Sequence, residues 1–182
     1  MEYIGKRISV LKKEGEISIV ILSTADKKKK LMLMIWFLLW TISGIIIFVQ
    51  FFLIKEEQTR IALLVWLGFW SYFEYMTFKA VMWRNSGVEK IKLRENKLFY
   101  KRDISGRGKI HVYELDFIKD LRLSEPKKNS FVEDLNNSYW VIAGEKILFD
   151  YYGKEVKIGI QLDEAESKSL FKILEREIRS ME

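Results

Sequence analysis

The side chains that most often carry out chemistry are scarce in this chain. It has no cysteine and a single histidine, His111. Without cysteine there are no disulfides, thiolate ligands or cysteine nucleophiles. One histidine cannot supply the usual zinc ligand set, and no Gly-x-Ser-x-Gly sequence provides a nucleophile for it. We therefore expect a protein that is not an enzyme, with no catalytic residues, no metal and no cofactor.

Glu74 is the residue whose position alone suggests a function. It lies in the apolar run Ile61 to Trp83, whose only charged members are Glu74 and Lys79. At about 1.5 Å per residue, Glu74 is roughly 13 Å along a helix from Trp83. An ionised carboxylate is costly there unless it is paired or protonated. Glu74 with Lys79 is thus a candidate intramembrane polar site, or else a carboxylate reached by water or by the Lys79 stem near the interface.

Four basic residues flank a predicted turn at Ser105 to Gly108. We expect this turn to bind lipid headgroups or an acidic partner, at about 1 kcal/mol per basic residue near a membrane surface. An ordinary solvated hairpin is the alternative. The four residues are Lys101, Arg102, Arg107 and Lys109.

The elements that must position these residues begin with two apolar runs. Residues 31–54 carry no charge, and residues 61–83 follow after a short connection, 55–60. Each run is long enough to cross a hydrocarbon core roughly 30 Å thick. A signal peptide does not fit the first run, which is too long and ends in large apolar residues. We predict two transmembrane helices joined by a short external loop.

Basic residues set the predicted orientation. Residues 1–30 carry eight Lys/Arg, whereas the connection carries two. Because basic residues stay on the cytoplasmic side, both termini are predicted to be cytoplasmic in a multi-pass inner-membrane protein. Four consecutive lysines directly before the first run are expected to contact headgroups: Lys27, Lys28, Lys29 and Lys30.

The remaining segment, 84–182, is predicted to be a β-rich cytoplasmic domain. Its 20 basic and 18 acidic residues are nearly balanced, so nucleic acid is not an expected partner. Short runs rich in β-branched and aromatic residues, separated by turn residues, predict about seven strands. These are Val88–Leu93, Lys97–Arg102, Lys109–Glu114, Phe117–Leu123, Ser138–Ala143, Lys146–Tyr151 and Glu155–Ile160.

The chain ends in a predicted amphipathic helix. Asp163 and Glu166 form a capping-box pattern, and Leu170, Leu174 and Ile178 recur at helical spacing, followed by Met181. Seven antiparallel strands with one C-terminal helix outline a pleckstrin-homology-like (PH-like) barrel or sandwich. The predicted fold is therefore an α+β membrane protein. Residues 17–22 could add a strand, and whether they pair with the C-terminal sheet stays open.

One set of residues carries a resemblance to known proteins: Trp83, Glu89 to Leu93, Leu98, Tyr113 to Leu115, Ile118 to Leu121, Gly144, Ile147, Phe149 to Tyr151, Gly153, Ile158, Gly159 and Leu162 to Glu166. In these residues the chain resembles uncharacterised bacterial two-transmembrane-helix proteins with a cytoplasmic PH-like domain. The similarity covers roughly residues 16–178 and implies this fold, but no reaction. In layout alone the chain is also similar to the photosystem I assembly factor of chloroplasts and cyanobacteria, which offers a precedent for assembly work.

Two functions of different classes follow. The first is a non-enzymatic, membrane-tethered binding or scaffolding module that assists assembly of a membrane complex. Its partners would be membrane lipids and another membrane or membrane-associated protein. The alternative is a small oligomeric transporter or channel subunit that uses Glu74, which would require a homo-oligomer because two helices make no evident pore.

Overall fold

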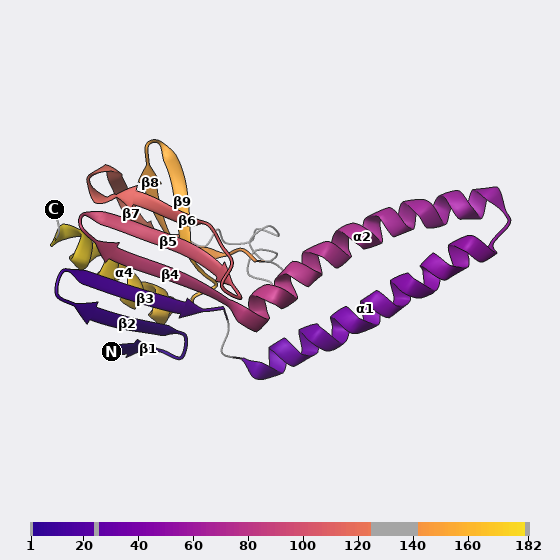
Figure 1. Ribbon diagram of the computed structural model, residues 1–182, viewed down its shortest axis with the longest axis horizontal. Helices are drawn as coiled ribbons and strands as arrows, with labels where there is room; N and C mark the ends of the chain where they lie inside the picture. The colour runs from indigo at the N-terminus through magenta and orange to yellow at the C-terminus, as the bar shows by residue number, and fades with distance from the viewer. Residues whose placement is uncertain (1, 24–25, 125–141, 181–182) are drawn as a thin grey trace.

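Two long helices extend from a domain of two antiparallel sheets and a shorter helix (Figure 1). The computed structural model describes residues 2–23, 26–124 and 142–180. The helices are α1 (Lys27–Leu53), α2 (Glu57–Ser86), α4 (Glu164–Arg179) and the 3-10 turn η1 (Leu115–Phe117). The strands are β1 (Glu2–Ile4), β2 (Ile8–Lys13), β3 (Glu16–Leu22), β4 (Gly87–Arg94), β5 (Lys97–Ile104), β6 (Ile110–Glu114), β7 (Ile118–Leu123), β8 (Glu145–Tyr151) and β9 (Lys154–Ile160).

Helices α1 and α2 are both long and apolar enough to cross a membrane. Only 11% and 6% of their most apolar windows are buried inside the molecule, so their apolar side chains are exposed. Core helices of soluble proteins are instead covered by protein. Asp26 caps α1 by accepting hydrogen bonds from the backbone amides of Lys28 (3.0 Å) and Lys29 (3.2 Å). The helices thus begin before the apolar runs themselves.

The two long helices pack closely at a glycine. A Cβ atom added at Gly44 would lie 2.0 Å from the Trp70 indole, so only glycine leaves room for this ring. The Trp70 indole N–H donates to the carbonyl of Trp40 (3.2 Å), and the Trp40 ring contacts that of Trp66. Aromatic packing and this interhelical hydrogen bond therefore help to hold the hairpin together.

The larger sheet joins segments on both sides of the hairpin. Its order is β1-β2-β3-β4-β5-β6, with every neighbouring pair antiparallel. Strand β3 precedes α1 and β4 follows α2, yet they pair from Leu22 with Val88 to Glu16 with Arg94. Residues 17–22 thus do pair with the C-terminal part, and β1 and β2 extend the sheet beyond what we predicted. The pairing puts both ends of the hairpin at the same end of the sheet.

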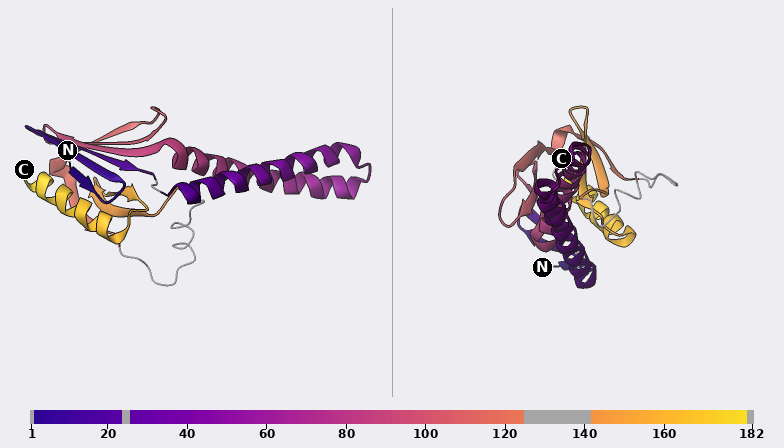
Figure 2. Two further views of the ribbon diagram at one scale, coloured as in Figure 1. Left: turned by 90° about the horizontal axis from the view of Figure 1, so that it is seen from below. Right: turned by 90° about the vertical axis from the view of Figure 1, so that its right-hand side faces the viewer.

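The smaller sheet, β7-β8-β9, and helix α4 enclose one core against the inner face of the larger sheet (Figure 2). Asp163 and Glu166 form the predicted capping box at the start of α4. Leu170, Leu174 and Ile178 are buried, as their spacing predicted, whereas Met181 lies outside the described residues. The α+β prediction, with two long apolar helices and a C-terminal helix, is confirmed.

Two details of the predicted fold need correction. Residues 138–141 of the strand predicted at Ser138–Ala143 lie outside the described residues, and Ile142 and Ala143 are not in a strand. No barrel closes in the described chain, because β6 pairs only with β5 and β9 only with β8. The domain is two separate sheets with an open seam between β6 and β9.

Candidate functional site

The four basic residues predicted to act together lie on different surfaces. Lys101 and Arg102 are consecutive in β5, and successive side chains of a strand point to opposite faces. The Lys101 ammonium lies 3.3 Å from Asp103 on the outer face of the larger sheet. Arg102 turns to the inner face, while Arg107 and Lys109 are exposed in the β5–β6 turn. The Lys101 ammonium also donates to the carbonyl of Gly106 in the turn (3.1 Å), so Arg102 is the one of the four that turns away from it.

The β5–β6 turn sits beside the end of α2. The hydroxyls of Ser105, in the turn, and Ser86, the last residue of α2, are 2.9 Å apart. Gly87 follows directly as the first residue of β4, and its backbone packs on the indole of Trp83, which is 1% exposed. Helix and sheet are thus joined without a linker, and the turn lies at the level where α2 ends.

Two arginines fasten this junction from the inside. Arg84, near the end of α2, is only 3% exposed and donates to the Ser23 carbonyl (3.3 Å) and the Gln161 side chain (2.6 Å). Arg7 donates to the carbonyls of Ser23 (3.1 Å) and Gln161 (2.6 Å) and lies 3.9 Å from Glu166. These bonds connect α2, the loop before α1 and the entry to α4, so the sheet domain is held against the hairpin.

The lysines that precede the first apolar run lie at the same junction. Lys27 to Lys30 form the first turn of α1, and the Lys30 ammonium donates to the Asn85 carbonyl near the end of α2 (3.3 Å). Lys29 lies 3.9 Å from Asp26. The basic start of α1 and the β5–β6 turn therefore both surround the place where the hairpin meets the sheet.

A buried carboxylate lies behind the inner face of the larger sheet. Glu89 is 1% exposed and accepts hydrogen bonds from the Tyr100 hydroxyl and the backbone amide of Ile160 (2.7 Å). Arg102 donates to the same Tyr100 hydroxyl (2.8 Å) and to Glu145 (2.6 Å). This chain of bonds ties β4 and β5 to β8 and β9, across the two sheets.

Burial controls the charge of this network. Loss of hydration raises the pKa of Glu89 above its ordinary value, although the bonds from Tyr100 and Ile160 act the other way. Burial next to Glu89 also raises the pKa of Tyr100. The Tyr100 hydroxyl therefore stays protonated and donates. The polar groups of this network are hydrogen-bonded to one another or to the backbone. This is typical of a polar network in a protein core rather than of a reactive centre.

The open seam between β6 and β9 forms a cleft of about 480 Å³. Its lining includes Arg102, Lys109, His111, Tyr113 and Lys157. The His111 ring stacks on that of Tyr113, with centroids 6.4 Å apart. His111 therefore contacts an aromatic side chain in an exposed strand.

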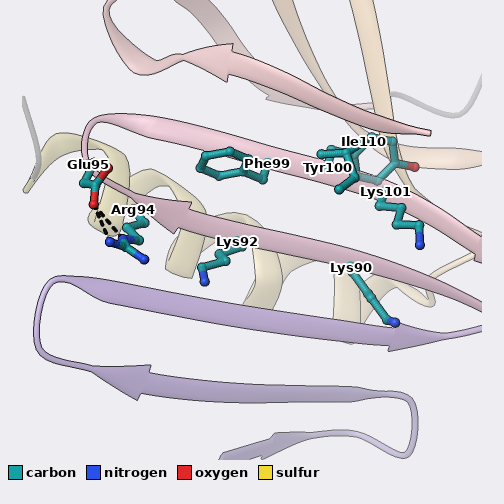
Figure 3. A pocket seen from close by; sticks show the side chains of 8 residues that line it. All are labelled: Lys90, Lys92, Arg94, Glu95, Phe99, Tyr100, Lys101 and Ile110. Carbon is teal, nitrogen blue, oxygen red and sulfur yellow. Dashed lines mark hydrogen bonds and ion pairs between the residues drawn. The ribbon is translucent and has the colours of Figure 1, made fainter. Parts of the chain in front are cut away.

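A second hollow, of about 500 Å³, lies on the outer face of the larger sheet (Figure 3). We call it the outer groove. It spans β4, β5 and β6, with Phe99 and Ile110 as its apolar side chains. Its cations are Lys90, Lys92, Arg94 and Lys101, and Glu95 is the acid that lines it.

Glu74 lies between the two long helices. The Thr41 hydroxyl of α1 donates to one Glu74 oxygen (2.7 Å), while the other oxygen is buried with no hydrogen-bond partner. Lys79 does not reach Glu74 but lies over the Tyr75 ring, 5.1 Å from its centroid. The two candidate intramembrane residues are therefore separate, and Glu74 joins α2 to α1.

The described residues offer no arrangement for metal chemistry. Within 2–23, 26–124 and 142–180, no three His, Asp or Glu side chains are grouped so that they could hold a metal ion. The arrangement that they do offer is non-covalent: exposed cations beside apolar side chains, on a domain fastened to an apolar hairpin. That arrangement suits binding of anionic groups.

Neither the buried network nor the outer groove was predicted. The alternation of side chains along the strands could have indicated both. Glu89 shares a face with Ile91 and Leu93, so an acid stands in an apolar series. Lys90 and Lys92 fall on the other face, where cross-strand pairing sets them beside Lys101 and Phe99. Strand pairing, rather than closeness in sequence, builds the groove.

Comparison with protein-family models, with curated proteins and with solved structures finds no match for this chain. The class that its own geometry defines is an α+β protein with an apolar helical hairpin and a two-sheet domain.

Proposed function

We propose that the chain is a non-enzymatic, membrane-tethered binding or scaffolding module that assists assembly of a membrane complex. The observation that carries this proposal is the junction between hairpin and sheet. Strand β3 leads into α1, and α2 runs directly into β4. Where they meet, Arg84 and Trp83 are buried and Arg7 is half-buried. A domain fastened in this way presents fixed surfaces at a membrane.

In this proposal the hairpin spans the inner membrane and both termini are cytoplasmic. The antiparallel pairing of β3 with β4 supports it, since the segments before and after the hairpin must then lie on one side. The excess of lysine and arginine in residues 1–30 supports the cytoplasmic side. The exposed apolar surface of α1 and α2 would be covered by lipid.

The basic residues at the junction would contact anionic headgroups. Arg107 and Lys109 lie in the turn that touches the end of α2, and Lys27 to Lys30 begin α1. Each cation near such a surface contributes about 1 kcal/mol. These contacts would fix how the domain is oriented over the bilayer.

A PH-like domain is the fold we propose for the part after α2. Two antiparallel sheets followed by a C-terminal helix support this assignment, with β4–β6 in one sheet and β7–β9 in the other. Fold likeness carries no ligand with it, so the binding function depends on the surfaces of this chain alone.

Crosslinking of the full-length protein in its native membrane, followed by purification, tests the proposal. A defined complex with another polypeptide is expected, and it should be lost when only the hairpin, residues 27–86, is expressed at equal level. Recovery of homo-oligomers alone, retained by that hairpin, would contradict the binding-module proposal.

That contradicting result would favour a small oligomeric transporter or channel subunit. The specific observation behind this second candidate is the buried Glu74 oxygen without a hydrogen-bond partner. In that case Glu74→Gln should abolish a proton- or ion-dependent flux in reconstituted vesicles while the protein still folds. Unchanged flux would exclude Glu74 as the transport site.

A further inference from the structure

The two faces of the larger sheet differ in what covers them. Ile8, Ile19, Ile91 and Leu98 on the inner face are at most 1% exposed, under the smaller sheet and α4. On the outer face, large apolar side chains remain in contact with solvent. They include Leu11 (39%), Leu22 (43%), Ile110 (58%) and Val112 (47%).

The outer groove combines this apolar surface with a row of cations. Lys90, Lys92 and Arg94 alternate along β4, so all three point outward. Across the strand pairing, Lys92 faces Phe99 and Lys90 faces Lys101. Phe99 and Lys101 in turn face Val112 and Ile110 on β6. A basic row therefore runs beside an apolar row, as Figure 3 shows for the groove residues that it labels.

The cations of the groove have acidic neighbours of two kinds. Lys92 pairs with Glu16 (2.9 Å), and the two side chains are 42% and 24% exposed. Pairs of this surface kind contribute only about 0–1 kcal/mol, so exchanging Glu16 for a carboxylate of a partner costs little. Lys90 and Lys101 share Asp103, which is only 4% exposed, so they would keep this neighbour and offer their remaining N–H donors to a partner.

The position of the groove favours a protein over the bilayer. Figure 1 shows the strands of the larger sheet extending away from the hairpin, so the outer face looks sideways rather than back along α1 and α2. Lys92 is five residues beyond Gly87, which is about 17 Å at about 3.3 Å per residue. The headgroup layer is only about 5–7 Å thick, so the centre of the groove lies beyond it.

We infer that the outer groove binds an acidic segment of a partner protein, in which carboxylates meet Lys90, Lys92 and Lys101 and apolar side chains meet Phe99 and Ile110. This inference rests on the proposed function and names the surface and the chemistry of the partner. Charge complementarity gives the segment its direction and register, while the apolar contact with Phe99 and Ile110 supplies its affinity.

The test uses the full-length protein in its native membrane, with the photoreactive residue p-benzoylphenylalanine in place of Ile110. A matched protein carries it in place of Lys172, an exposed residue of α4. Irradiation should crosslink position 110 to another protein, and sequencing of the crosslinked peptide should identify a segment of acidic and apolar residues. Position 172 should not give this product.

A synthetic peptide of that segment then serves as the probe, with the full-length protein in nanodiscs of zwitterionic lipid. Lys92→Glu should weaken binding about tenfold, and exchanging one acid of the peptide for lysine should restore part of the loss. Lys172→Glu, which changes the charge equally outside the groove, should leave binding unchanged. Binding should also fall as salt rises.

Crosslinking of position 110 to lipid, to a second copy of this chain or to a segment without acidic residues would overturn the inference. A partner captured at position 172 but not at 110 would overturn it while leaving the proposed function intact. A partner captured at neither position, together with homo-oligomers alone in the first experiment, would overturn both.

Discussion

At the scale of single residues, the most constrained group is the buried carboxylate of Glu89. Its two oxygens accept from Tyr100 and from the amides of Gly159 and Ile160. Glutamine has nearly the same shape but must turn an N–H toward one of these donors. The site therefore requires an acceptor on both sides, which only a carboxyl group supplies.

We predict that Glu89→Gln lowers the free energy of unfolding by about 1–3 kcal/mol, because one buried donor loses its acceptor. Denaturant unfolding of the full chain in detergent, followed by circular dichroism of the sheet, measures this change. Glu164→Gln, on the exposed first turn of α4, is the control and should have a much smaller effect. Equal effects of the two substitutions would contradict the role given to Glu89.

Glu89 should also make the stability of the folded protein depend on pH. Since burial raises the pKa of Glu89 in the folded state, the folded protein holds this proton more tightly than the unfolded chain does. The stability that the folded protein gains from binding this proton is complete below the ordinary glutamate pKa near 4.5. It is lost as the pH rises through the raised pKa of Glu89. Relative to Glu89→Gln, the wild-type protein should therefore lose stability with rising pH above about 4.5, as measured by unfolding at several pH values.

The contact of Glu74 with Thr41 gives a third prediction at this scale. The bond from Thr41 joins α1 to α2, and hydrogen bonds between membrane helices contribute about 0.6 kcal/mol on average. Thr41→Val should weaken the hairpin by about this amount in unfolding by sodium dodecyl sulfate. Ser43→Ala removes a hydroxyl that bonds its own helix at Trp40, so it is the matched control. A larger loss for Ser43→Ala would contradict the interhelical role.

At the scale of elements, Gly44 sets how closely the two long helices approach. We predict that Gly44→Leu destabilises the hairpin by about 1–3 kcal/mol, because its side chain would occupy the space of the Trp70 ring. Gly68→Leu is the control, since a Cβ there meets nothing within 4 Å. The same detergent titration compares them, and similar losses would mean that close packing at Gly44 is not what holds the helices.

Elements with strong local patterns could be predicted from the sequence, and their assembly could not. The capping box at Asp163, the stripe Leu170, Leu174 and Ile178, and the strands on each side of Asn96 follow from spacing and turn residues. Strands β1 and β2 were missed because they are short, with three and six residues. Strand β1 pairs with β2, and β2 forms a tight hairpin with β3, so both depend on the pairing of β3 with β4 in the larger sheet.

The candidate site was predicted only in part, for a related reason. Lys101, Arg102, Arg107 and Lys109 are close in sequence, but alternation along β5 sends Lys101 and Arg102 to opposite faces. The groove takes Lys101 together with cations of β4, a relation set by the register of β4 on β5. That register follows from the two-residue turn of Glu95 and Asn96, which sets Arg94 opposite Lys97. The groove was missed because the prediction grouped cations by closeness in sequence and did not pair the outward-facing residues of the two strands.

At the scale of the whole molecule, the hairpin and the sheet domain should move as one unit. Arg84 is the residue on which this depends most directly, because its buried guanidinium reaches both Ser23 and Gln161. We predict that Arg84→Leu broadens the distribution of distances between spin labels placed at positions 59 and 172. Because the chain has no native cysteine, spin labels would attach only at cysteines introduced at these two positions.

Pulsed electron resonance on the full chain in nanodiscs measures these distributions. Arg179→Leu, which removes only an exposed pair with Glu175, should leave the distribution as narrow as in the wild-type protein. An equally narrow distribution for Arg84→Leu would mean that the direct run of α2 into β4 is sufficient to hold the two parts together.

The pairing of β3 with β4 also has a consequence for biosynthesis. During translation, β1, β2 and β3 leave the ribosome before the hairpin, and the free edge of β3 must wait for a strand more than sixty residues later. That strand becomes available only once α2 has been made. If the hairpin spans a membrane as proposed, the sheet can be completed only when both ends of the hairpin lie on one side, and a chain inserted in another topology would keep an open strand edge that is prone to aggregation.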